Sequence, residues 1–313
     1  MKDKLKIEEI FYYKKEFKEL TEKEETWINY KVKRIKFLSP ILSKYKENNW
    51  IHGGVFYPSS NFNGKVILTI HPVHEAIPIF EEAVAYYFLK YGYKVAYISL
   101  PFHRERAPKG TKSGELFFSF EEEHTFSVMR QSVIDLKLFM DYLLEREGDE
   151  IFSIGLSLGA ILLNLLMGVD DRILKGVSIM GGGNMMRITI EGLYGLSARM
   201  YYKKQGLNWE TYEEEINNFL NYVNEVCKRK KLFTPPHKWY LVDPLTYACF
   251  NRPRKVMFIN GIFDKVIPKK AVIELWKKLG KPKIVWIPST HYTIPIFFPY
   301  AMKLSMEFFK TNT

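Results

Sequence analysis

A serine stands between two glycines in the stretch SIGLSLGAILL, residues 153–163. A serine hydroxyl is a weak nucleophile at neutral pH and needs a base within hydrogen-bond reach, most often a histidine that a carboxylate orients. The apolar run before Ser157 predicts a buried strand, and the leucine-rich run after it predicts a helix. This context predicts Ser157 as a nucleophile on a sharp strand-to-helix turn, and a plain glycine-rich bend is the alternative.

The two glycines are the residues that such a turn requires. Residues two before and two after the serine come close together, and only a residue without a side chain fits there comfortably. Gly155 and Gly159 occupy these positions. Ser157 would then begin a helix, where the free amide of Leu158 and the helix dipole can stabilise a developing negative oxygen.

A carboxylate and a histidine follow two later predicted strands. Asp264 comes after a strand in KVMFINGIFDKVIP, and His291 comes after the next strand in KIVWIPSTHYT. Loops that follow parallel strands gather at one edge of a sheet, which is also the edge that carries Ser157. The chain order of serine, aspartate and histidine is typical of one group of catalytic triads. Asp243 and Asp171 are the alternatives for the carboxylate.

The elements that must position these residues alternate along the chain. Apolar runs predict strands at residues 65–70, 94–100, 150–155, 175–182, 255–260 and 283–288, with amphipathic helices between them. This alternation predicts an α/β fold with a mostly parallel central sheet flanked by helices. Residues 50–60 and 65–73 are predicted to form a hairpin.

Two segments lie outside this alternation. Residues 1–49 are charged and amphipathic and are predicted to form an N-terminal helical extension, which leaves residues 50–313 as the main domain. Residues 184–241 lack a buried strand and are predicted to form a helical cap inserted in that domain. The aromatic and methionine side chains of this cap are predicted to share two roles, lining an acyl pocket and packing the cap on the body: Met185, Met186, Tyr194, Tyr201, Tyr202 and Trp209.

The motifs around Ser157, Asp264 and His291 resemble those of α/β-hydrolase fold enzymes over about residues 50–310. GVFYPSS, KVILTIHP and GLSLGA look most like the serine esterases of the dienelactone hydrolase and acetyl esterase branch. The resemblance implies hydrolysis of a small-molecule carboxylic ester through an acyl-enzyme, with no cofactor. A peptidase, thioesterase or acyltransferase would use the same triad, and a non-catalytic binding protein on a hydrolase fold is a further alternative.

The sequence departs from this family after the strand at 65–70. Many members have His-Gly here, whereas IHPVHEA places Pro72, which has no amide to donate, after His71. The second oxyanion donor beside Leu158 is therefore predicted to be Val73, with His74 as the fallback. The candidate substrate-binding residues are His71, His74, His103 and Arg104. For His71, the alternative to substrate binding is that its hydrogen bonds brace the loop of Val73. His103, Arg104 and Arg106 follow the strand at 94–100 and could face the cleft, where arginines would attract an acidic substrate. Pairing of these arginines with Glu121–Glu123 is the alternative.

Composition limits the remaining classes of function. The 313 residues carry a net charge of +11, but the lysines are spread among glutamates and no nucleic-acid motif accompanies them. The longest apolar stretch, residues 155–169, is too short for stable membrane insertion. The charged start of the chain lacks a signal peptide, which favours a cytoplasmic protein. Cys227 and Cys249 match neither a disulfide framework nor a metal site and are predicted to be reduced thiols.

Overall fold

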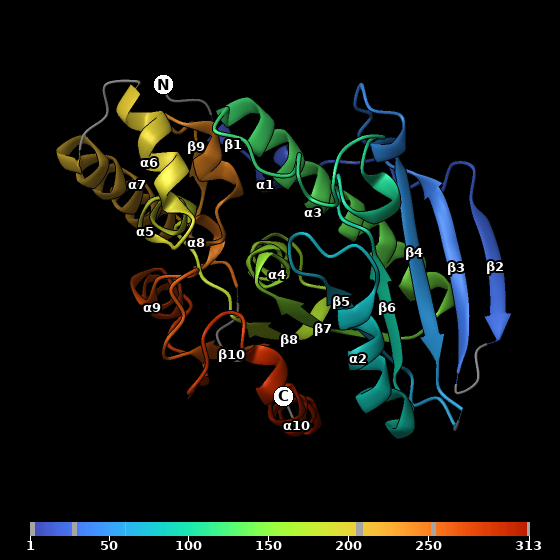
Figure 1. The fold of residues 1–313 in the computed structure, drawn as a ribbon. Coiled ribbons are helices and arrows are strands. Elements are labelled where there is room, and N and C mark those ends of the chain that lie inside the picture. The colour runs from blue at the N-terminus through green and yellow to red at the C-terminus, as the bar shows by residue number, and fades with distance from the viewer. Residues whose placement is uncertain (1–3, 27–29, 60, 205–208, 252–254, 312–313) are drawn as a thin grey trace.

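A nine-stranded mixed sheet forms the centre of the molecule in the computed structural model, which describes residues 4–26, 30–59, 61–204, 209–251 and 255–311. Its spatial order is β2-β3-β4-β6-β5-β7-β8-β10-β11 (Figure 1). The strands are β2 (Thr21–Thr26), β3 (Lys31–Leu38), β4 (Trp50–Tyr57), β5 (Lys65–Ile70), β6 (Lys94–Ile98), β7 (Glu150–Leu156), β8 (Ile173–Ile179), β10 (Val256–Gly261) and β11 (Ile284–Ile287). From β6 to β11 every neighbouring pair is parallel, whereas β2, β3, β4 and β6 pair in antiparallel fashion.

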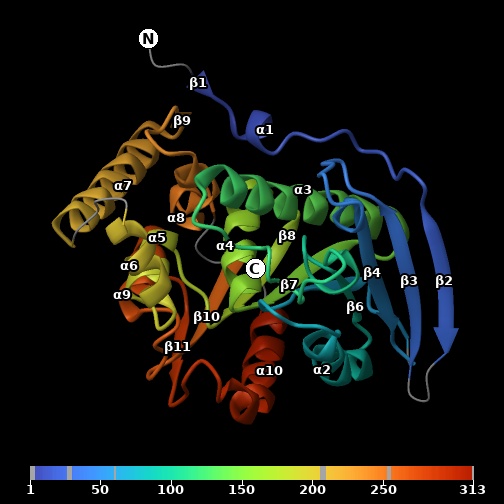
Figure 2. The ribbon, with the colours of Figure 1, turned by 45° about the horizontal axis from the view of Figure 1, so that its top comes forward.

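Helices cover both faces of this sheet. On one face α2 (Ile79–Phe88), followed by η2 (Leu89–Tyr91), lies beside α10 (Ile294–Lys310), and the other face carries α3 (Glu122–Arg146), α4 (Leu158–Val169), α8 (Pro244–Tyr247) and α9 (Lys269–Lys278) (Figure 2). The central strand β5 contributes Val66, Leu68 and Ile70 to one apolar core and Ile67 to the other. Because both its faces are buried, this strand has a run of consecutive apolar residues, 66–68, rather than a strict alternation of apolar and polar ones. The predicted α/β architecture is confirmed.

The predicted hairpin between residues 50–60 and 65–73 is wrong. β4 pairs with β3 and β6, and β5 pairs with β6 and β7, so β6 lies between the two strands. A strand that is buried on both faces is stable only with a partner on each side. β5 finds these partners in β6 and β7, which come later in the chain.

The prediction that residues 1–49 form helices is also wrong. After β1 (Lys4–Leu5) and the single turn α1 (Ile7–Ile10), this segment forms β2 and β3 and ends in η1 (Glu47–Asn49). β3 pairs with β4 along its whole length and buries Val32, Ile35 and Phe37. Basic residues separate these apolar ones, and Lys33 among them bonds to the buried carboxylate of Glu147 at 2.8 Å. In sequence, this mixture of apolar and charged residues makes the segment resemble an amphipathic helix. Pairing with the edge of β4 decides its structure.

The segment 184–241 folds as helices beside the sheet. It contains α5 (Met185–Glu191), α6 (Gly195–Lys204) and α7 (Trp209–Arg229), then the short β9 (Leu232–Phe233), which pairs with β1, and η4 (Lys238–Val242). The buried carboxylate of Asp243 accepts hydrogen bonds from the amides of Asn184, Met185 and Leu245. Asp243 thus fastens the start of the segment to α8. Among the described residues, no helix combines the length and apolar character needed to cross a membrane.

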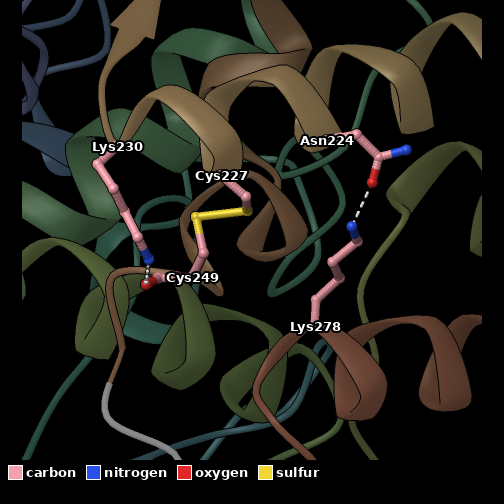
Figure 3. Close-up of a disulfide and its surroundings, with 5 residues drawn as sticks. All are labelled: Asn224, Cys227, Lys230, Cys249 and Lys278. Atoms are coloured by element: carbon pink, nitrogen blue, oxygen red, sulfur yellow. Dashed lines mark hydrogen bonds between the residues drawn. A yellow bond between two sulfur atoms is a disulfide. The ribbon is translucent and has the colours of Figure 1, made fainter.

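A disulfide joins Cys227 at the end of α7 to Cys249 just after α8, which corrects the prediction of two reduced thiols (Figure 3). Their Cα atoms are 5.5 Å apart, within the range of disulfides. The fold brings the two residues together by turning the chain back between α7 and α8, which the spacing of the cysteines does not reveal. Two polar contacts flank the disulfide: Lys230 with the carbonyl oxygen of Cys249 at 3.1 Å, and Lys278 with Asn224.

Removal of this disulfide is expected to loosen the attachment of α7. Replacing both cysteines by serine should lower the free energy of unfolding by about 3 kcal/mol, since the closed loop is short. Thermal unfolding with and without dithiothreitol measures the effect. The reductant should lower the melting temperature of the wild type and leave that of the double variant unchanged. Equal melting temperatures of the wild type in both conditions would contradict the expectation.

Candidate active site

Ser157 lies at the junction between β7 and α4. Its backbone has φ 54° and ψ −114°, in the left-handed half of conformational space that residues with side chains rarely occupy. Its amide bonds to the carbonyl oxygen of Ile179 at 2.9 Å, which ties the strained turn to β8. Helix α4 begins at Leu158, directly after Ser157. The amide of Leu158 is one of the first amides of the helix, which have no hydrogen-bond partner within it.

Gly155 and Gly159 make this turn possible. A Cβ atom on Gly155 would lie 2.3 Å from the carbonyl oxygen of Gly159, and one on Gly159 would lie 1.8 Å from the carbonyl oxygen of Ile70 and 2.8 Å from that of His71. Backbone atoms surround both positions, so no side chain can move aside. The same contacts bring the end of β5, and with it the loop of Val73, against the turn of Ser157.

The substitution Gly159→Ala is expected to destabilise the protein by about 3 kcal/mol or more, because its methyl group meets backbone rather than side chains. Gly110→Ala is the matched control. Gly110 has φ +85° but nothing within 4 Å of the added atom, so it costs only the conformational strain of about 1 kcal/mol. Thermal unfolding compares the two variants. Equal melting temperatures would show that the close approach at Gly159 does not matter.

His291 and Asp264 form a chain of hydrogen bonds with Ser157. The Ser157 hydroxyl lies 2.9 Å from Nε2 of His291, and Nδ1 of His291 lies 2.8 Å from Oδ2 of Asp264. Asp264 follows β10 and His291 follows β11, and these parallel neighbours end at the same edge of the sheet as β7. The side chains of Asp264 and His291 are 3% and 13% exposed. Neither predicted alternative, Asp243 or Asp171, takes the position beside the histidine.

Backbone groups hold the two partner loops. Oδ1 of Asp264 accepts hydrogen bonds from the amides of Val266 at 2.8 Å and Ile267 at 3.0 Å, so the carboxylate keeps Oδ2 for the histidine. The loop of His291 is closed by the Thr293 hydroxyl, which accepts from the amide of Thr290 at 2.9 Å. Hydrogen bonds within each loop therefore hold the carboxylate and the histidine loop in place.

His71 braces the loop that carries Val73. Its side chain is fully buried, its Nε2 accepts from the amide of Leu100 at 3.0 Å, and its Nδ1 lies 2.7 Å from the carbonyl oxygen of Pro72. Burial, with the nearby charge of Arg104, holds the pKa of His71 well below its ordinary value, so the ring is neutral. These bonds occupy both ring nitrogens, and we assign His71 to loop support rather than to substrate contact.

His103 and Arg104 are buried rather than presented to the site. Burial lowers the pKa of His103 to about 4, and its Nδ1 lies 2.9 Å from the carbonyl oxygen of Pro101. The Arg104 side chain is 2% exposed and bonds through Nη2 to Glu75 at 2.6 Å and to Glu81 at 2.9 Å. Burial raises the pKa of Glu81 to about 8. Both side chains are thus buried and bonded within the protein, and their contact with substrate stays a prediction. The alternative pairing of Arg104 with Glu121–Glu123 is wrong, since its partners are Glu75 and Glu81.

His74 is the predicted substrate-binding residue that remains accessible. It is exposed, has φ 62°, and its Nδ1 lies 3.1 Å from the carbonyl oxygen of Ser113. Val73 is half-buried and packs against the apolar core beside α4. Both residues stand on the loop that touches the turn of Ser157.

Two tyrosines lie beside the candidate site. The hydroxyls of Tyr194, in the turn before α6, and Tyr292, next to His291, contact one another. Tyr194 is among the predicted cap residues. Tyr292 is a further residue of the site, and its position directly after the predicted base is its only signal in the sequence. The side chains of Tyr202 and Trp209, also predicted cap residues, lie outside those that the structure describes.

Known proteins resemble this chain in structure and not in sequence. No protein-family model matches it, and no curated protein is similar to it. Among solved structures, a cold-adapted esterase from an Arctic intertidal metagenomic library is similar with a TM-score of 0.56 at 15% identity, over 94% of this chain and 99% of that one. A Paenibacillus acetyl xylan esterase has a TM-score of 0.61 at 12% identity, over 96% and 92% of the two chains. An esterase of Pyrococcus furiosus has a TM-score of 0.53 at 16% identity, over 99% and 97%.

Proposed function

This chain has the α/β-hydrolase fold, and from that fold we propose that it is a serine esterase that cleaves small-molecule carboxylic esters. The hydrogen-bonded chain from Ser157 through His291 to Asp264 is the observation that carries the proposal. The esterases among the structures similar to it support the choice of substrate class.

In the proposed reaction, the Ser157 hydroxyl oxygen attacks the ester carbonyl while Nε2 of His291 takes the hydroxyl proton. Asp264 holds the imidazole in the tautomer that leaves Nε2 free, and it stabilises the imidazolium that forms. The amides of Leu158 and Val73 stabilise the negative oxygen of the tetrahedral intermediate. His291 then gives its proton to the leaving alcohol, and an acyl group remains on Ser157.

Water completes the cycle. His291, now neutral, removes a proton from a water molecule as its oxygen attacks the acyl carbonyl, and the same proton returns to Ser157 when the acid leaves. Each step uses groups that the fold already holds together. The left-handed backbone of Ser157 keeps its hydroxyl clear of the turn, so little rearrangement precedes attack.

Labelling by a fluorophosphonate tests the proposal. The probe should phosphonylate the wild type at Ser157, as mass spectrometry of the digested protein would show, and p-nitrophenyl acetate should be hydrolysed. A folded wild type that neither reacts nor turns over the ester would refute the esterase and would favour a non-catalytic binding protein. Parallel assays with a thioester, a peptide anilide and an acceptor alcohol distinguish thioesterase, peptidase and acyltransferase activity.

A further inference from the structure

The helix α6 presents apolar side chains outward. Leu196 and Met200 are 62% and 57% exposed and lie four residues apart, on one side of the helix. Leu193, in the turn before α6, is 52% exposed. The opposite side of α6 is also apolar, since Ala198 is buried in a small core with Ile190, Tyr212 and Ile216. Packing against the rest of the protein therefore explains the apolar face of α6 that contains Ala198, but not the exposed face that contains Leu196 and Met200.

The loops of the candidate site extend this outward surface. Phe263, next to Asp264, is 58% exposed; Tyr292, next to His291, is also 58% exposed; and Ile296, at the start of α10, is 75% exposed. The segments are joined directly. The amide of Leu193 donates to the carbonyl oxygen of Lys265 at 2.7 Å, and Tyr194 contacts Tyr292. We call this surface, made by Leu193, Leu196, Met200, Phe263, Tyr292 and Ile296, the rim surface.

The charged groups along the rim surface are almost all positive. Residues 193–204, 262–270 and 290–300 contain one acidic residue, Asp264, whose side chain is buried against His291. The basic residues of these segments are all exposed: Arg199, Lys203, Lys204, Lys265, Lys269 and Lys270. Apolar side chains interspersed with exposed lysines match the boundary between headgroups and acyl chains of an anionic membrane.

A hollow beside the rim surface carries two of these basic residues. It has a volume of about 340 Å³ and is lined by Glu191, Gly192, Leu193, Arg199, Lys265 and Pro268. The acidic member, Glu191, is engaged by Arg187 and by the hydroxyl of Tyr212. Arg199 donates through Nη1 to the carbonyl oxygen of Ile190. The hollow thus offers Lys265 and the remaining guanidinium nitrogens of Arg199 to an anionic group.

We propose that the rim surface binds the surface of an anionic phospholipid membrane. Leu196, Met200 and Phe263 would lie at the boundary between the headgroups and the acyl chains, and the basic residues would contact lipid phosphates. A second copy of this chain is the less suitable partner, because a two-fold contact through this face would place basic residues opposite basic residues. If the proposed esterase activity holds, the site at the rim receives esters that reside in the membrane.

Flotation with lipid vesicles tests the proposal. The wild type and the variant Ser157→Ala should both float with phosphatidylglycerol-rich vesicles at low salt. Both should bind pure phosphatidylcholine vesicles at least about tenfold more weakly, and added salt should weaken binding to the anionic vesicles. Because Ser157→Ala is expected to bind, the result does not depend on whether the protein is an esterase.

Two variants and one control locate the surface. Leu196→Asp/Met200→Asp should weaken vesicle binding at least about tenfold, and Lys203→Glu/Lys204→Glu should do the same on anionic vesicles only. Leu42→Asp is the control, since Leu42 is a similarly exposed leucine at 68%. It follows β3, and β3 lies at the opposite end of the molecule from α6 (Figures 1 and 2). Circular dichroism confirms the fold of each variant.

The following outcomes would overturn the proposal. The wild type does not bind anionic vesicles, or it binds both lipids equally. Alternatively, Leu42→Asp loses as much binding as the α6 variants do. A wild type that is a dimer by light scattering, becomes a monomer through Leu196→Asp/Met200→Asp and does not float would assign the rim surface to self-association instead.

Discussion

Replacing Ser157 by alanine is expected to lower kcat for ester hydrolysis by about 10⁶-fold, with a residual rate above that of water. In the proposed reaction the hydroxyl oxygen is the attacking atom, and the proposed base His291 lies 2.9 Å away with Asp264 on its other nitrogen. The remaining acceleration would come from the oxyanion donors and from binding. Initial rates with p-nitrophenyl acetate measure the loss.

The control for this variant is Ser59→Ala, at an exposed serine that follows β4. Its kcat should stay within about twofold of the wild type, since surface substitutions rarely matter away from a site. Ser157→Ala should also keep the melting temperature and lose all fluorophosphonate labelling. A variant that retains a tenth of the wild-type rate would show that another nucleophile performs the reaction.

The three residues of the candidate site could be predicted because each sits next to a local signal. A glycine pair marks Ser157, and an apolar strand immediately precedes both Asp264 and His291. The parallel arrangement then brings the three together without further information. Such reasoning works where neighbours in sequence decide the structure.

Contacts between distant segments explain the errors. Residues 21–26 and 31–38 contain nearly as many charges as a surface helix would, and they form strands because β3 pairs with the edge of β4 and β2 pairs with β3. The spacing of Cys227 and Cys249 does not show that α7 and α8 meet. Similarly, Arg104 pairs with carboxylates before it in the chain, on the loop and helix that follow β5, rather than with the acidic run after it. Local pattern does not identify partners at such separations.

Arg106 also has partners that are distant in the chain. The sequence allowed it to face the cleft, but its side chain is fully buried behind β6. It donates through Nη2 to Asp135 on α3 at 2.7 Å and to the carbonyl oxygen of Asn48 at 2.7 Å, and through Nη1 to that of Ser99 at 3.0 Å. The other carboxylate oxygen of Asp135 accepts from Ser39 at 2.6 Å. Arg106 thus joins η1, the residue that follows β6, and α3.

The substitution Arg106→Met is expected to destabilise the protein by about 3 to 5 kcal/mol at about pH 8, because it leaves the charge of Asp135 buried and unpaired. Urea unfolding measures the loss. The matched control is Arg229→Met, which removes an ion pair with Glu225 of the same length, 2.7 Å, between side chains that are 50% and 42% exposed. That loss should stay below about 1 kcal/mol. Equal effects of the two substitutions would contradict the importance of burial.

The pH dependence of this loss identifies its cause. Burial raises the pKa of Asp135, and Arg106 opposes that rise, so removal of the arginine should raise the pKa of the native state further. A carboxyl group with a raised native pKa binds more protons folded than unfolded, and its contribution to stability therefore falls as pH rises through that pKa. The loss caused by Arg106→Met should accordingly be smaller at about pH 5 than at about pH 8, and Arg106→Met/Asp135→Leu should recover most of it at both. A loss that is independent of pH and persists in the double variant would mean that the unpaired carbonyl oxygens of Asn48 and Ser99, rather than the buried carboxylate, are the dominant cost.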